Sequence, residues 1–266
     1  MTGRPGRPRA GEDRDTAGAV LSAAAELFSS VGYTATSTYA VAERAGVRQA
    51  SIYHHFRGKP AILLSLLLTT LRPALALADH LVAAPGSAAA RLWALCDADA
   101  RLLADGPVNL GALMHLPEVR GEAFTEFRDL RARLRSRYDA LVAEVLGSAD
   151  ASPCPERNDL PAVSRHTRPL DVAAAGTLVF GLVESVIAER REGGVLRAAA
   201  VAPTVADAAL RVLGLGPAAV ARARSEAVRL PAVAPPAPAA PEPGPQPAPR
   251  SAGTDEMTTA QVADVG

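Results

Sequence analysis

Three residues between positions 36 and 59 constrain the fold of this chain more than any other feature. Ala42 is small, Gly46 follows four residues later, and the aliphatic Ile52 follows six residues after that. A small residue lets a second helix cross closely, and glycine at the turn accepts a left-handed backbone that other residues disfavour. The apolar core beneath the crossing would comprise Val41, Ala45, Val47 and Ile52. The spacing predicts a helix-turn-helix, with helices over 38–45 and 49–55.

An amphipathic helix precedes this motif, from Asp15 to Val31. Its apolar residues repeat on one helix face, namely Val20, Leu21, Ala24, Leu27, Phe28 and Val31. Gly32 then ends the helix. The three helices are expected to form a head over residues 15–59. Residues 1–14 consist mainly of Gly, Pro and charged residues, a composition that predicts a disordered arm.

The remainder of the chain is also predicted to be helical, so the fold class is all-α. Ala and Leu dominate while aromatic residues make up only 4%, which favours helices over strands. Apolar spacing predicts helices over 60–84 with a kink at Pro73, 87–104, 108–115, 118–146, 170–190 and 204–213. They would form a helical domain over residues 60–215, interrupted by a loop at 148–168. Residues 231–266 are rich in Pro and Ala and predict a disordered tail.

The outer face of the second helix of the motif would lie in a major groove if DNA were bound. The candidates for base edges are Arg48, Gln49, Ser51 and His54, and the candidates for phosphate are Ser37, Thr38, Tyr53 and Lys59. Arginine suits guanine and glutamine suits adenine, because each pair forms two hydrogen bonds. Alternatives stay open: Ser37 equally suits a helix cap, Tyr53 half-buried packing, and His54 an ordinary surface position.

Residues 20–64 resemble the DNA-binding domain of the TetR (tetracycline repressor) family. The matching stretches, in the order and spacing of that family, are AAAELFSSVGYTATS, VAERAGV and ASIYHHFRGKPAIL. The resemblance implies a three-helix DNA-binding head, a variable helical ligand domain, a homodimer, and release from an operator when a small molecule binds. It also implies that seven residues face DNA: Ser37, Arg48, Gln49, Ser51, Tyr53, His54 and Lys59. The sequence departs from the family at Arg48, where a small capping residue is frequent, and at Pro60, where an acidic residue is usual.

The predicted helix at 170–190 is apolar on all sides, so both of its faces must be buried. One face can pack on its own domain and the other on a second copy of the chain. The expected interface residues are Leu178, Leu182, Val183 and Val186. The resemblance agrees, since the last two long helices usually form the dimer interface of the family. Two reading helices in a dimer would recognise an inverted-repeat operator in double-stranded DNA.

The helical domain is expected to hold a pocket for a small, largely apolar or amphipathic ligand of unknown identity. The candidate lining residues are Trp93, Cys96, Asp97, Met114, His115, Phe124, Phe127, Phe180 and Glu184, together with Leu67 and Tyr138. His115, Asp97 and Glu184 would be polar anchors in this pocket. The alternative stays open that most of these residues are ordinary core. Arg128, Arg131 and Arg135 fall mostly off the apolar stripe of their helix and are interpreted as a solvated face, with contact to nucleic acid as the alternative.

The sequence contains no nucleophile elbow, phosphate loop, dinucleotide fingerprint or metal-ligand spacing, so we expect neither an enzyme nor a bound cofactor or metal. Cys96 and Cys154 form no disulfide framework, and the N-terminus has no secretory signal, which predicts a cytoplasmic protein. The apolar runs at 61–71 and 172–188 are too short, or interrupted by Glu184, to predict membrane spans. The leading hypothesis is a repressor that a ligand releases from DNA; the alternative is control by a protein partner, which the Pro/Ala-rich tail would fit.

Overall fold

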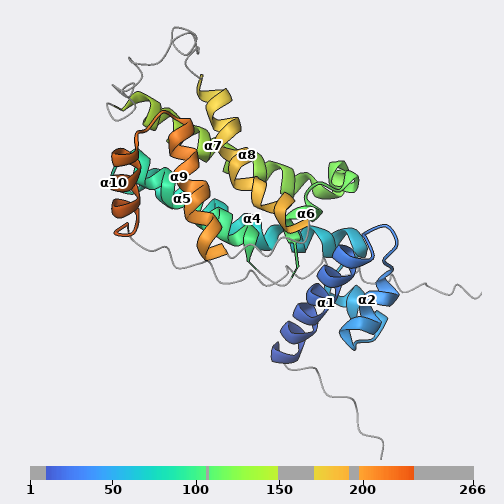
Figure 1. Ribbon diagram of the computed structural model, residues 1–266. Coiled ribbons are helices and arrows are strands. Elements are labelled where there is room, and N and C mark those ends of the chain that lie inside the picture. The colour runs from blue at the N-terminus through green and yellow to red at the C-terminus, as the bar shows by residue number, and fades with distance from the viewer. Residues whose placement is uncertain (1–9, 106–107, 149–170, 192–197, 231–266) are drawn as a thin grey trace, which may run out of the picture.

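The computed structural model describes residues 10–105, 108–148, 171–191 and 198–230, and every regular element in them is a helix, which confirms the all-α fold. Helices α1 (Ala10–Ser30), α2 (Thr38–Ala45) and α3 (Gln49–His55) form a head at one end of the molecule (Figure 1). The remaining helices form an elongated body beside it. They are α4 (Lys59–Ala83), α5 (Ala88–Ala104), α6 (Leu110–Leu113), the 3-10 helices η1 (Pro117–Arg120) and η2 (Glu122–Phe124), α7 (Thr125–Gly147), α8 (Val172–Arg191), α9 (Ala198–Val212) and α10 (Pro217–Ala227).

Local capping explains why the two helices of the motif begin and end at the predicted residues. The Ser37 side chain accepts a hydrogen bond from the amide of Ala40 (3.0 Å), which fixes the start of α2. Gly46 lies in the left-handed region, with φ of 69°. The amide of Val47 then donates to the carbonyl of Ala42 (3.0 Å), which closes the end of α2. The predicted helix-turn-helix geometry is confirmed.

Several helix assignments differ from the sequence prediction. Helix α7 begins at Thr125 and not at 118, because η1 and η2 occupy the segment before it. Helix α1 begins at Ala10, inside the segment that was predicted to be a disordered arm. Helix α9 begins at Ala198 and passes through Pro203, although the prediction placed its start at Thr204. Helix α10 was not predicted at all, because only Val220, Ala223 and Ala227 are buried and such small side chains give a weak apolar period. The predicted loop at 148–168 and the tail at 231–266 lie almost wholly or wholly outside the described residues.

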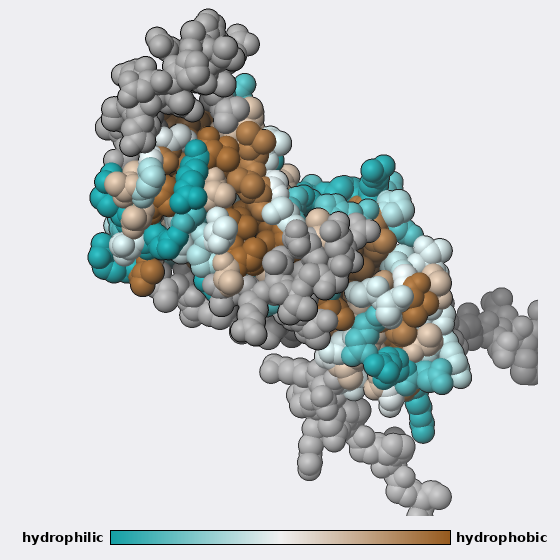
Figure 2. Space-filling model, in the orientation of Figure 1, coloured by the Kyte–Doolittle hydropathy of each residue, from teal (hydrophilic) through white to brown (hydrophobic). Residues whose placement is uncertain are grey.

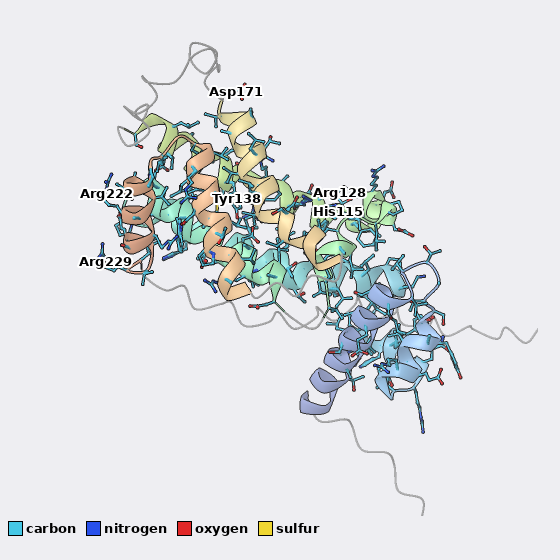
Figure 3. The ribbon with its side chains drawn as sticks, in the orientation of Figure 1. His115, Arg128, Tyr138, Asp171, Arg222 and Arg229 are labelled. Carbon is cyan, nitrogen blue, oxygen red and sulfur yellow. The ribbon has the colours of Figure 1, made fainter. Side chains whose placement is uncertain are left out.

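Helix α5 is the central element of the body. It contacts α4, α7, α8, α9 and α10, and its residues are buried on most sides. Tyr138 of α7 lies near the middle of the body and is fully buried (Figure 3). Helix α4 is long and apolar enough to cross a membrane by composition, but it packs against α5 and α7, and this packing accounts for much of its apolar character.

The head joins the body through α1, which packs against α4 and α6. A polar contact adds to this joint: the Thr34 hydroxyl donates to Oε1 of Glu118 on η1 (3.0 Å). Thr34 lies in the loop between α1 and α2, only three residues before the cap of α2. The position of η1 is therefore linked directly to the segment that leads into the helix-turn-helix.

The face of α8 that points away from the body is apolar. Figure 2 shows a brown band along α8 beside α9. Leu178 is 48% exposed and Val172 is 39% exposed on α8, and Val212 at the end of α9 is 37% exposed. Exposed apolar patches of this kind are typical of surfaces that contact another molecule.

Candidate functional site

Helix α3 presents a polar outer face. Arg48, Gln49, Tyr53 and His54 are exposed, Ser51 is half-buried, and Ile52 on the opposite side is fully buried. Segments 37–39 and 48–54 contain no acidic residue. A surface of hydroxyl, amide, imidazole and guanidinium groups without a carboxylate suits the negative backbone and the base edges of DNA.

Three side chains connect the start of α2 with this outer face. The Tyr53 hydroxyl lies 3.3 Å from Oγ1 of Thr38, and the Gln49 amide donates to the same oxygen (3.4 Å). Tyr53 is 56% exposed, so the alternative that it packs half-buried is wrong. The alternative for Ser37 is correct, since its side chain caps α2. Thr38, Gln49 and Tyr53 therefore form one exposed polar cluster.

Lys59 does not point toward this face. Its ammonium group donates to the carbonyl oxygens of Tyr33 (2.8 Å), Thr34 (3.3 Å) and Thr36 (2.9 Å), and it lies 4.4 Å from the centre of the Tyr33 ring. An ammonium has three donors, and all three are used. The prediction that Lys59 contacts phosphate is therefore corrected: Lys59 clamps the loop between α1 and α2.

One exposed aromatic residue of the head is absent from the predicted DNA-facing set. Tyr39 lies in the first turn of α2 and is 64% exposed, next to the cluster of Thr38. The sequence pattern could have identified Tyr39 as exposed. Val41 and Ala42 occupy the inward positions of α2, and this leaves Tyr39 on the outside. We add it to the candidate DNA-facing residues.

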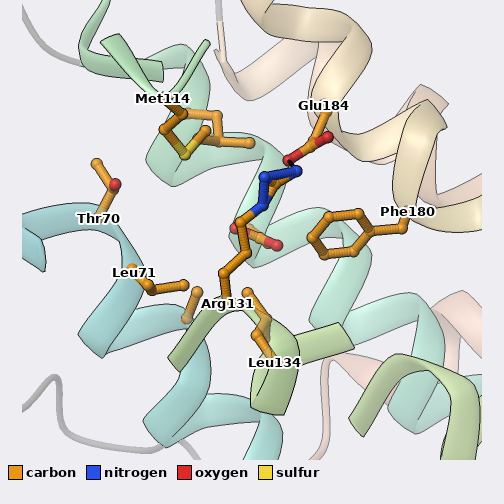
Figure 4. A pocket seen from close by; sticks show the side chains of 10 residues that line it. Thr70, Leu71, Met114, Arg131, Leu134, Phe180 and Glu184 are labelled. Carbon is orange, nitrogen blue, oxygen red and sulfur yellow. Dashed lines mark hydrogen bonds and ion pairs between the residues drawn. The ribbon is translucent and has the colours of Figure 1, made fainter. Parts of the chain in front are cut away.

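A small cavity lies in the body between α4, α5, α7 and α8, close to the end of α6 (Figure 4). It is lined by Thr70, Leu71, Ala74, Asp99, Leu103, Met114, Arg131, Leu134, Phe180 and Glu184. Its volume is about 20 Å³, which is room for about one water molecule. The lining is apolar apart from Thr70 and the three charged side chains of Asp99, Arg131 and Glu184.

An ion pair forms the outer wall of this cavity. The Arg131 guanidinium on α7 donates to Oε1 of Glu184 on α8 (2.5 Å), and it lies 5.4 Å from the centre of the Phe180 ring (Figure 4). The same three residues also line a hollow on the outside of the body, with a volume of about 380 Å³. Arg131, Phe180 and Glu184 therefore lie between the inner cavity and the outer hollow, and we call them the gate.

A buried carboxyl group faces the cavity from α5. Asp99 is 5% exposed, and the Tyr138 hydroxyl donates to its Oδ2 atom (2.8 Å). The pKa of Asp99 is raised to about 6. Burial is the largest cause; the Tyr138 hydrogen bond lowers this pKa, nearby Glu184 raises it and Arg131 lowers it. Burial also raises the pKa of Tyr138 and of the neighbouring Cys96, so both stay protonated at neutral pH.

Three predicted pocket residues, Met114, Phe180 and Glu184, line the cavity. The others do not. Trp93 donates to Asp207 (2.8 Å), Asp97 pairs with Arg101 (2.8 Å), and His115 is exposed near η1 (Figure 3). The remaining three, Cys96, Phe124 and Phe127, are ordinary buried core. Tyr138 reaches the site indirectly, through Asp99, whereas Leu67 is core.

The interpretation of Arg131 as part of a solvated face is wrong. The Arg131 side chain is 29% exposed and closes the cavity with Glu184. Arg128 is exposed, as predicted, and donates to the carbonyls of Val119 (3.1 Å) and Gly121 (2.6 Å). Helical spacing could not identify the partner of Arg131, because Glu184 is separated from it by 53 positions.

Two of the four predicted interface residues must be corrected. Val183 and Val186 are 0% and 1% exposed, so they lie in the core of their own protomer and cannot contact a second copy. Leu178 and the half-buried Leu182 lie on the outer side of α8, within the apolar band. Since α8 is apolar on every side, its inner face could not be told from its outer face by the pattern of its residues.

Among the described residues, no three His, Cys, Asp or Glu side chains gather closely enough to hold a metal ion. Cys96 is a buried free thiol, and Cys154 lies outside the described residues. The polar face of the head and the gated cavity of the body are thus the two features of the described chain that suit binding.

Comparison with known proteins agrees with this architecture. The model of the tetR family of bacterial regulatory proteins matches residues 20–66. AmtR from Mycobacterium smegmatis is 40% identical, with a TM-score of 0.64, over 87% of this chain and 99% of AmtR. PfmR from Thermus thermophilus, a TetR family transcriptional regulator, is 27% identical, with a TM-score of 0.57, over 72% of this chain and 97% of PfmR.

A more distant structure shares the fold. FadR from Bacillus subtilis, solved in complex with stearoyl-CoA, is 20% identical, with a TM-score of 0.52, over 74% of this chain and 96% of FadR. No curated protein matches the chain. The matched helix-turn-helix, its polar outer face and the full-length similarity to AmtR lead to one conclusion. The chain belongs to the TetR family and is a DNA-binding transcriptional regulator.

Proposed function

We propose that this protein is a cytoplasmic repressor that binds an inverted-repeat operator as a homodimer and leaves it when a small molecule enters the gated cavity. The cavity carries this proposal. The gate lies between it and the outer hollow, where a ligand can displace Arg131, and a short series of contacts leads from the cavity to the head. FadR, which shares this fold, was solved in complex with stearoyl-CoA, and this supports the view that a protein of this fold can bind a small molecule.

DNA recognition is assigned to the polar face of the head. Arg48, Gln49 and His54 would read base edges, because they are exposed on the outer side of α3, and the half-buried Ser51 lies beside them. Thr38, Tyr39 and Tyr53 would contact phosphate from the two sides of the polar cluster. Lys59 would act indirectly, by holding the loop that positions α2.

The homodimer interface is assigned to the apolar band on α8 and α9. At about 25 cal/mol per Å² of apolar surface, covering a band of several hundred Å² is worth many kcal/mol. The interface residues are now Val172, Leu178, Leu182 and Val212, in place of the buried valines. Two reading heads about 34–36 Å apart would fit successive major grooves on one side of DNA.

The route from the cavity to the head passes through α6 and η1. Met114 lines the cavity at the end of α6, and Glu118 on η1 accepts a hydrogen bond from Thr34. The backbone of Thr34 is in turn held by Lys59, directly before α2. A ligand that moves α6 would thus shift the head without altering the reading residues.

The test starts by selecting bound sequences from a random DNA pool with the full-length protein. We expect an inverted repeat. Arg48→Ala and Gln49→Ala should each relax the preference at particular base pairs by about 1–3 kcal/mol. Arg133→Ala is the matched control, since Arg133 is an exposed arginine on α7, in the body. Unchanged preferences in both head variants would contradict the assigned face.

The ligand part is tested separately by native mass spectrometry of the protein after gentle purification. A bound small molecule whose removal restores operator binding supports the proposal. A homodimer without a small molecule, whose operator binding changes only when another protein binds, favours control by a protein partner instead.

A further inference from the structure

We propose that the effector is an organic cation with an apolar body, whose positive charge takes the place of the Arg131 guanidinium beside Glu184 and Asp99. This inference rests on the proposed function, because it specifies the ligand class of the same cavity. The apolar part of the ligand would lie against Leu71, Leu103 and Leu134.

The charges around the cavity do not balance. Arg131 pairs with Glu184 (2.5 Å), and Arg135 at the outer hollow pairs with Asp139 (3.1 Å). Asp99 has no ion-pair partner among the described residues, and the hydrogen bond that it accepts comes from the neutral Tyr138 hydroxyl. One buried carboxyl group is therefore left without a paired cation, and it faces the cavity. A buried carboxylate without a cation is costly, so a cationic ligand gains from supplying one.

Arg131 already shows how a cation is held at this place. Its guanidinium binds the Glu184 carboxylate on one side and lies 5.4 Å from the centre of the Phe180 ring. A carboxylate combined with an aromatic face is the combination that attracts organic cations. The Arg131 side chain is 29% exposed and sits on a long flexible stem at the surface, so it can turn outward into water.

The volumes fit this exchange. The inner cavity of about 20 Å³ is too small for an organic ligand, while the outer hollow has about 380 Å³. The gate residues line both spaces, so turning Arg131 outward would join them. The joined space lies within the range of about 300–1,000 Å³ that is typical of small-molecule sites.

An anionic ligand fits less well. It would take the place of Glu184 on Arg131, but its charge would then face the Asp99 carboxylate, and like charges repel in a site of low polarity. Arg135 offers little help, because it is already engaged with Asp139 and with the Thr177 hydroxyl (2.7 Å). A neutral ligand would bring no cation to Asp99, so the buried carboxyl group would stay unpaired.

The test measures binding of three probes with the same chain length to the full-length protein by isothermal titration calorimetry at pH 7.5. The probes are hexyltrimethylammonium, hexan-1-ol and hexanoate. We expect the ammonium to bind at least about tenfold more tightly than the other two, the equivalent of one good charge contact. Tighter binding of hexanoate or of hexan-1-ol would overturn the proposal, as would equal binding of all three probes.

Three variants locate the site. Glu184→Gln and Asp99→Asn should each weaken binding of hexyltrimethylammonium by about tenfold and leave binding of hexan-1-ol unchanged. Arg131→Met should strengthen binding of hexyltrimethylammonium, because the competing internal cation is gone while both carboxyl groups remain. Weaker or unchanged binding to the Arg131→Met variant would overturn the proposal. Glu126→Gln is the control, since Glu126 pairs with Arg72 (2.7 Å) on the outside of the body.

Operator binding is measured in the same samples, so that the two proposals fail separately. One outcome is that hexyltrimethylammonium binds in a way that depends on Glu184 and Asp99 while the operator stays bound. That result would support the proposed ligand class and contradict ligand-induced release. If another class of small molecule releases the operator and the ammonium does not bind, release stands and the cationic ligand is overturned.

Discussion

Replacing Asp99 with asparagine should stabilise the folded protein at pH 7.5 and have little effect near pH 4. Asp99 is 5% exposed, and burial is the largest cause of its raised pKa of about 6. Asparagine has nearly the same shape and retains an oxygen that can accept the Tyr138 hydrogen bond (2.8 Å). The substitution therefore removes the buried charge and keeps the packing.

The magnitude follows from the shift in pKa. A rise from 3.8 to about 6 corresponds to about 3 kcal/mol, at about 1.36 kcal/mol per pKa unit. Since the folded state holds the proton more tightly, the contribution of Asp99 to stability is fully present below pH 3.8 and is lost as the pH rises through about 6. The asparagine side chain has no proton to lose, so the advantage of the variant should grow from near zero to about 3 kcal/mol over this interval.

The assay is urea unfolding of both proteins at several pH values between 4 and 8, at one protein concentration. Asp97→Asn is the matched control on the same helix, because Asp97 pairs with Arg101 (2.8 Å) and its loss should destabilise at neutral pH. A destabilised Asp99→Asn variant at pH 7.5, or a difference that does not change with pH, would refute the view that Asp99 is a buried, ionised carboxyl group.

Four further substitutions test other parts of the structure. Lys59→Met should lower the free energy of unfolding, measured in urea, by about 2–3 kcal/mol, because three carbonyls lose a charged donor. The same variant should bind the operator more weakly, with unchanged salt dependence. Gly111→Ala should lower the free energy of unfolding by about 1–3 kcal/mol, because the new Cβ would lie 2.6 Å from the Ile187 side chain. Gly18→Ala on α1 should raise the free energy of unfolding by about 0.5–1 kcal/mol, because no atom lies within 4 Å of the new Cβ. Leu178→Arg should split the dimer in light scattering but leave the helical content of the protomer intact; an unchanged mass would move the interface elsewhere.

The bounds of α2 and α3 could be predicted to the residue because their signals are local. Ser37 caps α2 within three residues, and Gly46 closes it within four. The exception is Lys59, whose partners are backbone carbonyls of residues 33–36. Every residue has a backbone carbonyl, so these acceptors produce no pattern of residue types. The contacts of Lys59 with the loop therefore could not be distinguished from a phosphate contact by the sequence alone.

The cavity could be predicted only in part because its contacts join distant positions. Apolar spacing identified Met114 and Phe180 as inward residues, and Glu184 as a polar residue among them. It gave no sign that Arg131 crosses from α7 to α8, or that Tyr138 meets Asp99 across 39 positions. Helical periodicity reports which side of a helix is apolar, whereas the choice of partner depends on how α5, α7 and α8 are packed.

The joint between body and head explains how a change at the gate can reach DNA. Glu118 holds Thr34 through Oε1, but within the described part of the chain its other oxygen, Oε2, is buried without a hydrogen-bond donor. The polar contact between Thr34 and Glu118 is a single hydrogen bond, worth about 1.5–3 kcal/mol, so little is lost when η1 moves. Gly111 of α6 packs directly on Ile187, one helical turn beyond Glu184, so a displacement of α8 is passed to α6 and then to η1. The head itself is held by Ser37, Gly46 and the Lys59 clamp, and we therefore expect it to move as a unit and change the spacing of the two reading helices.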